Sequence, residues 1–205
     1  SLDGILGVVC VNGDGHDAGS TVLTVTCDAT TITNTLDSGD VLNISDSGDA
    51  GASTYTLTAT TFQRTGTALV TYGTVETLNV SAGTGADTIN VTTTAASVNT
   101  TINTTAGGDT VNVTATGATS NVVINGDAGA NAITITTTGA ASVTVVNAGG
   151  GADVLTLVAN GANSGVGLNG DAGTDTINVR STSAGSATVA NGGANTDTIN
   201  ISSNA

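Results

Sequence analysis

Short segments in the second half of the chain alternate apolar and polar residues and recur at a constant interval. The first is Asp87-Thr-Ile-Asn-Val91, and every later copy begins 22 residues after the previous one. The later copies begin at Asp109, Asn131, Asp153, Asp175 and Asp197. The third and fifth residues of each copy are Ile, Val or Leu and the fourth is Asn or Thr, which predicts a short strand with one buried face. A fixed period without insertions indicates a repeat architecture.

Each repeat also contains a second apolar segment, which ends one residue before an asparagine. These asparagines are Asn103, Asn125, Asn147, Asn169 and Asn191. Two strands and two turns in 22 residues make one coil, so like residues of successive coils stack about 4.8 Å apart and asparagines can form amide ladders. The outer face of this strand leaves two alternatives, because some of its expected outward positions are apolar: Val123, Val143, Val145 and Val189. Either the strand bends there, or an apolar stripe faces solvent.

The pattern predicts an all-β protein, a parallel β-solenoid (β-helix) of about nine 22-residue coils. We expect it to be right-handed, because parallel crossovers generally are. We expect a single domain over 1–205, with an irregular N-terminal cap region at 1–52, transitional coils at 53–86 and regular coils at 87–205. Asp40-Val-Leu-Asn-Ile44 reads as one more copy of the repeated strand. A cap is expected because the terminal coils of a solenoid need a cover.

Composition and charge narrow the classes of partner and function. The chain has 205 residues, 1% aromatic residues, two cationic side chains (Arg64 and Arg180) and a net charge of −14. This charge disfavours nucleic acid and anionic membranes as partners. The sequence contains no run of about 20 apolar residues, so it does not predict a membrane-spanning segment. With so few basic groups we expect no catalytic residues and no enzyme. Cys10 and Cys27 predict a disulfide and an extracellular or cell-surface location, although two buried thiols are the alternative.

The turns before the aspartates carry a family resemblance. Ala82-Gly-Thr-Gly-Ala-Asp-Thr-Ile-Asn90, Ala148-Gly-Gly-Gly-Ala-Asp-Val-Leu-Thr156 and Gly170-Asp-Ala-Gly-Thr-Asp-Thr-Ile-Asn178 resemble the calcium-binding nonapeptide of RTX proteins, Gly-Gly-x-Gly-x-Asp-x-apolar-x. The resemblance implies Ca²⁺ as a cofactor. The ligands it implies are Asp87, Asp109, Asp153, Asp175 and Asp197, with Asp127 and Asp171 added from the turns.

This chain departs from the RTX pattern. It has one nonapeptide in each coil, whereas the family repeats the motif in tandem, and Asn131 and Asn195 interrupt the pattern. Aspartates stacked about 4.8 Å apart would repel one another, which favours a bound cation. The alternative is that each aspartate accepts backbone N–H groups and caps its turn, while water and salt screen the column.

Residues 53–91 also resemble a stretch found in large secreted bacterial repeat proteins, through Tyr55-Thr-Leu-Thr58, Arg64-Thr-Gly66 and Gly85-Ala-Asp-Thr-Ile-Asn-Val91. The resemblance implies a surface or matrix component, adhesin-like and often associated with calcium. We therefore expect a non-enzymatic extracellular structural protein that forms a filament or surface layer. The alternative is that the chain is a piece of a larger secreted repeat protein, as a calcium-stiffened adhesin-type binding module with cell-surface glycans as partners. An ice-binding protein with outward Thr columns is a third class.

We expect the partner to be the chain itself, in a head-to-tail homopolymer. The sequence ends at Ala205, four residues after the strand 197–201, so we expect the last coil to be uncovered. Uncovered strand edges are templates for further strands. The residues expected to meet at this assembly edge are Ile199 and Ile201 at one end and Ile5, Val8, Val9 and Val11 at the other.

Overall fold

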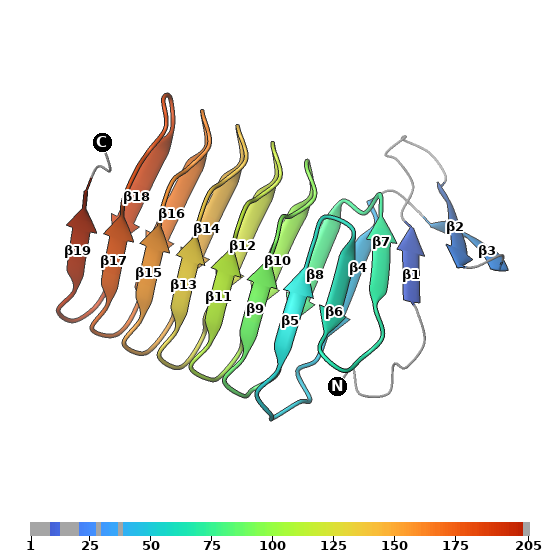
Figure 1. Ribbon diagram of the computed structural model, residues 1–205, viewed down its shortest axis with the longest axis horizontal. Coiled ribbons are helices and arrows are strands. Elements are labelled where there is room, and N and C mark those ends of the chain that lie inside the picture. Colours follow the sequence, from blue (N-terminus) through green and yellow to red (C-terminus); the bar gives the residue numbers. More distant parts are fainter. Residues whose placement is uncertain (1–8, 13–20, 28–29, 37–38, 203–205) are drawn as a thin grey trace.

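The computed structural model describes residues 9–12, 21–27, 30–36 and 39–202, and it describes side chains from residue 39 onward. These residues form strands and turns without a helix, in an all-β parallel solenoid (Figure 1). Accordingly, this part of the chain contains no helix that could span a membrane. The predicted fold class is confirmed.

Seven strands precede the regular coils: β1 (Val9–Asn12), β2 (Thr21–Cys27), β3 (Thr30–Leu36), β4 (Val41–Ser45), β5 (Thr54–Leu57), β6 (Thr61–Arg64) and β7 (Val70–Gly73). Twelve follow: β8 (Thr77–Ser81), β9 (Thr88–Val91), β10 (Asn99–Asn103), β11 (Thr110–Val113), β12 (Asn121–Asn125), β13 (Ala132–Ile135), β14 (Val143–Asn147), β15 (Val154–Leu157), β16 (Gly165–Asn169), β17 (Thr176–Val179), β18 (Ala187–Asn191) and β19 (Thr198–Ile201).

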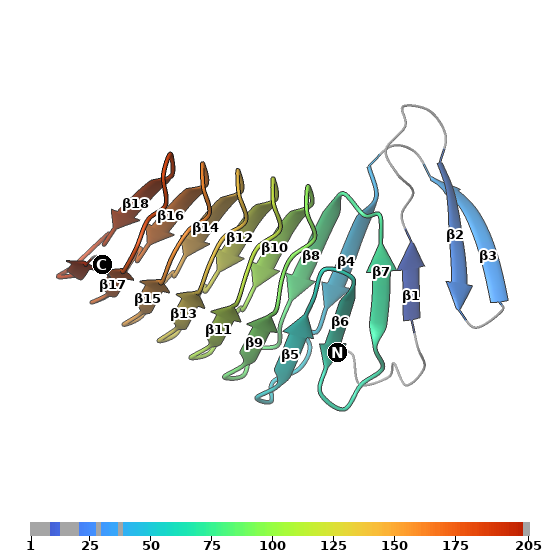
Figure 2. The ribbon, with the colours of Figure 1, turned by 45° about the horizontal axis from the view of Figure 1, so that its top comes forward.

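Two sheets make up the solenoid. One has the order β1-β7-β6-β5-β9-β11-β13-β15-β17-β19, and the other has the order β18-β16-β14-β12-β10-β8-β4. From β8 and β9 onward, neighbouring strands of each sheet pair in parallel with the 22-residue register that the repeat predicts, as in Ile133 with Val111 and Ile124 with Ile102. Figure 2 shows the two sheets running side by side along the stack.

Among the described residues the stack contains seven layers, from β4 with β5 to β18 with β19, which is fewer than the expected number of about nine coils. The sequence between β5 and β8 forms no further coils, because β5, β6 and β7 pair antiparallel instead. Antiparallel strands need only the short turns present between these strands, whereas another parallel layer would need a longer crossover.

The core lies between the sheets and follows the alternation of the repeat. The third and fifth residues of every copy except the last are buried, including Ile89, Val111, Ile133 and Leu155. Burial of these β-branched and leucine side chains, in contact with the same positions of adjacent layers, stabilises a core that has few aromatic residues. Tyr55 and Phe62 stack in the first layers with ring centroids 5.9 Å apart.

The structure resolves the second strand of the repeat in favour of an outward apolar stripe. β12 and β14 stay regular, and alternate residues point inward. Val143 and Val189 are 47% and 63% exposed, while Val123 and Val145 are half-buried. The asparagine ladder is confirmed, because the Nδ2 of Asn125, Asn147 and Asn169 each donates to Oδ1 of the asparagine one coil earlier, at 2.8, 2.9 and 2.9 Å.

Residues 40–44 were misassigned from sequence. β4 pairs with β8 in the seven-stranded sheet, so it corresponds to the second strand of the repeat and not to Asp87–Val91. The alternation of apolar residues around an asparagine is common to both strands, which explains the wrong assignment.

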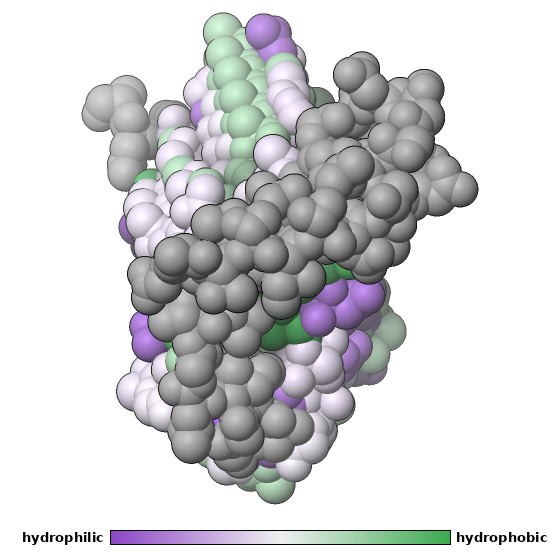
Figure 3. All heavy atoms as spheres, turned by 90° about the vertical axis from the view of Figure 1, so that its right-hand side faces the viewer, coloured by the Kyte–Doolittle hydropathy of each residue, from purple (hydrophilic) through white to green (hydrophobic). Residues whose placement is uncertain are grey.

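Figure 3 looks along the stack from the end that contains β1 and β4. It shows a row of weakly hydrophobic residues that follows one edge of the solenoid.

The predicted N-terminal assembly edge and the predicted disulfide fall wholly or partly on residues that the structure does not describe. Ile5 and Val8 of the assembly edge are not among the described residues. Cys10 belongs to β1 and Cys27 ends β2, but their side chains are outside the described part, so the disulfide stays a prediction. Val9 and Val11 lie in β1, which pairs in parallel with β7 at one edge of the ten-stranded sheet.

Candidate functional site

The aspartates that precede the strands of the ten-stranded sheet form a buried column inside the solenoid. We call Asp87, Asp109, Asn131, Asp153 and Asp175 the aspartate column. The four aspartates are each 1% exposed and Asn131 is 2% exposed. The 22-residue register places them one above another, because each immediately precedes a strand of the ten-stranded sheet. Carboxylates at this depth need partners, since burying an unpaired charge is very unfavourable.

One oxygen of each side chain has such a partner. Oδ1 accepts the backbone N–H of the equivalent residue in the preceding layer, which links successive turns. The bonds are Ser53 N to Asp87 at 2.8 Å, Asp87 N to Asp109 at 2.8 Å, Asp109 N to Asn131 at 2.9 Å, Asn131 N to Asp153 at 2.6 Å, Asp153 N to Asp175 at 2.9 Å and Asp175 N to Asp197 at 3.0 Å. This agrees with the expected role of the aspartates as caps of their turns.

The second oxygen has none. Oδ2 of Asp87, Asp109, Asp153 and Asp175 is buried without a hydrogen-bond partner. Asn131 shows what surrounds this position, because its Nδ2 donates to the carbonyl oxygens of Gly126, Gly129 and Ala148 at 3.3, 3.2 and 3.2 Å. At the aspartates the same position holds a carboxylate oxygen, which can accept a hydrogen bond but cannot donate one while it is ionised.

Electrostatics reflect this arrangement. Desolvation by burial raises the pKa of Asp87, Asp109 and Asp153 above the ordinary value of a carboxyl group. Repulsion from the neighbouring carboxylate adds to the pKa of Asp87 through Asp109 and to that of Asp153 through Asp175, while the backbone N–H bonds act in the opposite direction. Burial and like charge both favour the protonated form.

Two occupants would give the unpartnered Oδ2 atoms a partner. A proton on Oδ2 turns the acid into a donor, as the amide of Asn131 already is. A cation would be held by oxygen atoms alone, which is the donor set that Ca²⁺ prefers. The residues therefore fit calcium chemically, with carbonyls supplying most of the ligands. Among the described residues, no three acidic, His or Cys side chains come together as a metal cluster.

The other predicted ligands lie elsewhere. Asp127 and Asp171 are exposed in the turn before the column, and both adopt left-handed backbone conformations, with φ of 58° and 66°. They alternate along this turn with Gly149 and Gly193, which are also left-handed. Asp197 continues the column in the last layer and is only half-buried. The predicted ligand set thus splits into a buried column and an exposed pair.

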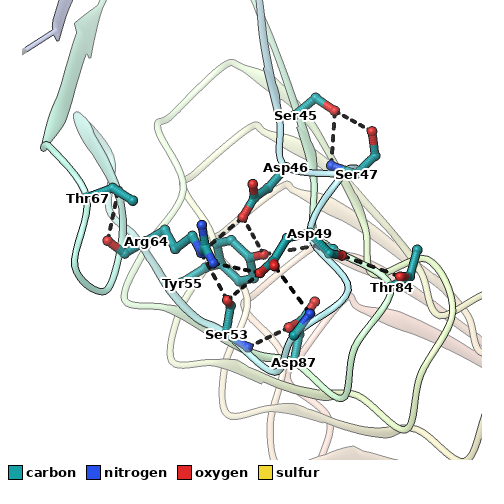
Figure 4. Close-up of polar contacts among 12 residues, drawn as sticks. Ser45, Asp46, Ser47, Asp49, Ser53, Tyr55, Arg64, Thr67, Thr84 and Asp87 are labelled. Carbon is teal, nitrogen blue, oxygen red and sulfur yellow. Dashed lines mark hydrogen bonds and ion pairs between the residues drawn. The ribbon is translucent and has the colours of Figure 1, made fainter. Parts of the chain in front are cut away.

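Sequence reasoning missed a second buried acidic group, in the first layers (Figure 4). The guanidinium of Arg64 lies 3.1 Å from Asp46 and 2.7 Å from Asp49, and its Nε donates to Ser53 at 2.9 Å. The hydroxyl of Tyr55 donates to Asp46 at 2.9 Å, and its pKa is raised by burial. The signal in the sequence was Arg64 itself, because a rare cation in so acidic a chain is expected to pair with carboxylates.

Comparison with known proteins gives no relative: no family model, no curated protein and no solved structure matches the chain. The function therefore has to be argued from the geometry of the solenoid.

Proposed function

We propose that the protein is a non-enzymatic structural component of an extracellular filament or surface layer, built by head-to-tail stacking of solenoid subunits. The proposal rests on the two edges of the ten-stranded sheet. β19 forms one edge and β1 the other. β6 runs antiparallel to β5, and β7 runs antiparallel to β6, so β7 and its parallel neighbour β1 run in the same direction as β19. The antiparallel pair of β2 and β3 lies beside β1 (Figure 2), so a second copy would continue one parallel sheet across the junction only with this pair displaced.

The end at β19 is open and apolar. Ile199 and Ile201 are 44% and 77% exposed, and no described strand pairs with the outer edges of β18 and β19. A hollow of about 440 Å³ opens between these strands, lined by Val179, Ala190, Ile199 and Ile201 among others. Exposed apolar side chains and unpaired backbone groups both favour addition of a strand.

The contact is heterologous, since the end with β19 meets the end with β1. Such a contact does not close on itself and propagates as a fibre. The seven-stranded sheet would be interrupted at each junction, because β6, β7 and β1 extend only the ten-stranded sheet beyond the first layer. The subunit boundary should therefore be weaker than the stacking within a subunit.

Ile201→Asp tests the junction. It places a charge at the exposed end of the stack, where it should leave the fold intact and abolish end-to-end polymers seen by electron microscopy and sedimentation velocity. Val154→Asp is the matched control, because Val154 is 43% exposed on the outer face of β15, far from the end. Deleting residues 1–11 should also abolish polymers and leave the array folded. A wild-type protein that stays monomeric at high concentration overturns the proposal.

The unpartnered Oδ2 atoms favour a second candidate, a calcium-stiffened adhesin-type module with cell-surface glycans as partners. In that case added Ca²⁺ raises the melting temperature of the wild type, and the double variant Asp153→Asn/Asp175→Asn diminishes the rise. Asp127→Asn/Asp171→Asn is the control, because it makes the same charge change at exposed positions. A melting temperature unaffected by millimolar Ca²⁺ and by chelator removes this candidate.

A further inference from the structure

The antiparallel pair of β2 and β3 covers the end of the stack that the proposed junction needs. In the described part of the chain, β1 is the last strand of the ten-stranded sheet at this end, and it pairs only with β7. β2 lies against β1, and Figures 1 and 2 both show β2 on the side of β1 away from β7, with β3 beyond it. The chain therefore shields its own edge strand, which is one way in which proteins prevent edge-to-edge association.

This cover is not an integral part of the solenoid. β2 and β3 pair with each other over seven residues and form a separate two-stranded sheet, so no ladder among the described strands joins them to β1. A two-stranded ribbon is only marginally stable by itself in water. The pair therefore depends on its contact with the end of the stack, whereas the parallel coils do not depend on the pair. We expect it to leave the edge without unfolding the solenoid.

The two cysteines of the chain lie in the two strands that meet at this contact. Cys10 lies in β1, in register with Thr71 of β7, and Cys27 is the last residue of β2. The disulfide predicted between them would join the cover to the strand that it covers. A disulfide limits the conformations open to the released segment, and for a loop of about 15 residues this corresponds to roughly a hundredfold preference for the closed state.

We propose that β2 and β3 form an autoinhibitory cover of the β1 edge, held in place by a Cys10–Cys27 disulfide. With the disulfide formed, the β19 edge of a second copy can pair with β1 only by displacing the cover. Reduction releases the cover and exposes the edge, so assembly is favoured where a dithiol is supplied. The inference rests on the proposed function, because it assigns a control to the same junction.

The reductant is a dithiol, either a small molecule or a protein. One of its thiolates attacks a sulfur atom of the disulfide, which forms a mixed disulfide and releases the other cysteine as a thiolate. The second thiolate of the reductant then displaces the remaining cysteine. Two electrons pass to the protein, the reductant becomes a disulfide, and the protons of the dithiol end on Cys10 and Cys27.

The cover lowers the fraction of subunits that can assemble and does not abolish assembly. The apparent Kd for adding a subunit rises in inverse proportion to the fraction of open subunits. Oxidised wild-type protein should therefore polymerise at high concentration. Reduced protein should polymerise at a concentration lower by about tenfold or more.

A concentration series followed by sedimentation velocity and electron microscopy measures this shift. The wild type is first oxidised with glutathione disulfide and then studied with and without dithiothreitol. Cys10→Ser/Cys27→Ser should polymerise at the lower concentration without reductant, and it should not respond to dithiothreitol, which controls for other effects of the reagent. Equal threshold concentrations for the oxidised and reduced wild type overturn the proposal. Alkylation and mass spectrometry that find no Cys10–Cys27 disulfide in the oxidised protein also overturn it.

Hydrogen exchange distinguishes a failure of the cover from a failure of the junction. It is measured at a concentration where the protein is monomeric. Reduction should remove amide protection from residues 21–27 and 30–36, because the released pair is only marginally stable, while β9 to β17 keep theirs. Unchanged protection of the pair overturns the proposal, whatever the polymers do. If protection is lost but neither the reduced wild type nor the double variant polymerises at any concentration, the cover is supported and the head-to-tail function falls.

Discussion

Asp46 in the first layers and Asp153 in the regular coils are both buried, but their surroundings differ. Asp46 is fully buried, accepts a hydrogen bond from Tyr55 and forms an ion pair with Arg64. Asp153 has one hydrogen-bonded oxygen and one oxygen without a partner. The first layers thus neutralise a buried acid with an arginine, whereas the described residues of the coils place no cationic side chain beside Asp153.

The difference follows from how each region is built. The antiparallel strands β5, β6 and β7 bring Arg64 beside residues far away in sequence, which is possible because this region does not repeat. A stack with a 22-residue period places each aspartate at the same position of its layer, where its hydrogen-bond partner is a backbone N–H of the neighbouring layer. The coils therefore leave one carboxylate oxygen to be balanced by a proton or by a cation from solution.

The largest loss of stability is expected when the arginine that neutralises the acids of the first layers is removed. Arg64→Gln leaves Asp46 and Asp49 without their cation, and removing one partner of a buried ion pair costs about 3–5 kcal/mol. Urea unfolding at neutral pH should show this loss. Arg180→Gln is the control, because Arg180 is exposed. Equal effects of the two changes would show that the Arg64 network does not stabilise the first layers.

A smaller loss of stability is expected when the one asparagine of the aspartate column is replaced by aspartate. Asn131→Asp replaces an amide that donates to three carbonyls with a carboxylate that cannot, and it joins the two halves of the column into one run of acids. Leaving buried groups unsatisfied costs about 1–3 kcal/mol. Asn112→Asp makes the same change on the exposed face and should cost less. If both variants unfold alike in chelator, the surroundings assigned to the column are wrong.

The alternating pattern was sufficient to predict the solenoid, the register and the inward residues, because each depends on neighbours exactly one period away. Arg64 with Asp46 could not be paired in this way, since their contact depends on the hairpin turns between β5 and β7. The sequence placed Asp87 and Asp127 in one ligand set. The structure shows that they belong to different environments. Asp87 is buried, whereas Asp127 is exposed in a turn with a left-handed backbone conformation.

The pH dependence should also differ between the regions. The pKa values of Asp87, Asp109 and Asp153 are raised in the folded protein, so the folded state holds protons that the unfolded chain has released. Their contribution to stability is full below the unfolded pKa, about 3.9, and is lost as pH rises through the folded values. In chelator, the free energy of unfolding should therefore fall as the pH rises above about 4. Stability that stays flat or rises over this range would contradict the raised values.

The smallest effect is a gain in stability. Asp109→Asn copies the residue type of Asn131: its Oδ1 still accepts the N–H of Asp87, while its amide supplies a donor at the position where Oδ2 now has no hydrogen-bond partner. We expect a gain of about 1 kcal/mol in chelator at pH 7, the usual net value of a buried hydrogen bond. The exposed change Asp127→Asn removes the same charge and controls for general repulsion. The gain should shrink as the pH falls, because burial raises the pKa of Asp109 and the acid then carries its own proton. A gain that persists unchanged at pH 4 would show that Asp109 is not short of a donor, and the comparison between the two regions would fail.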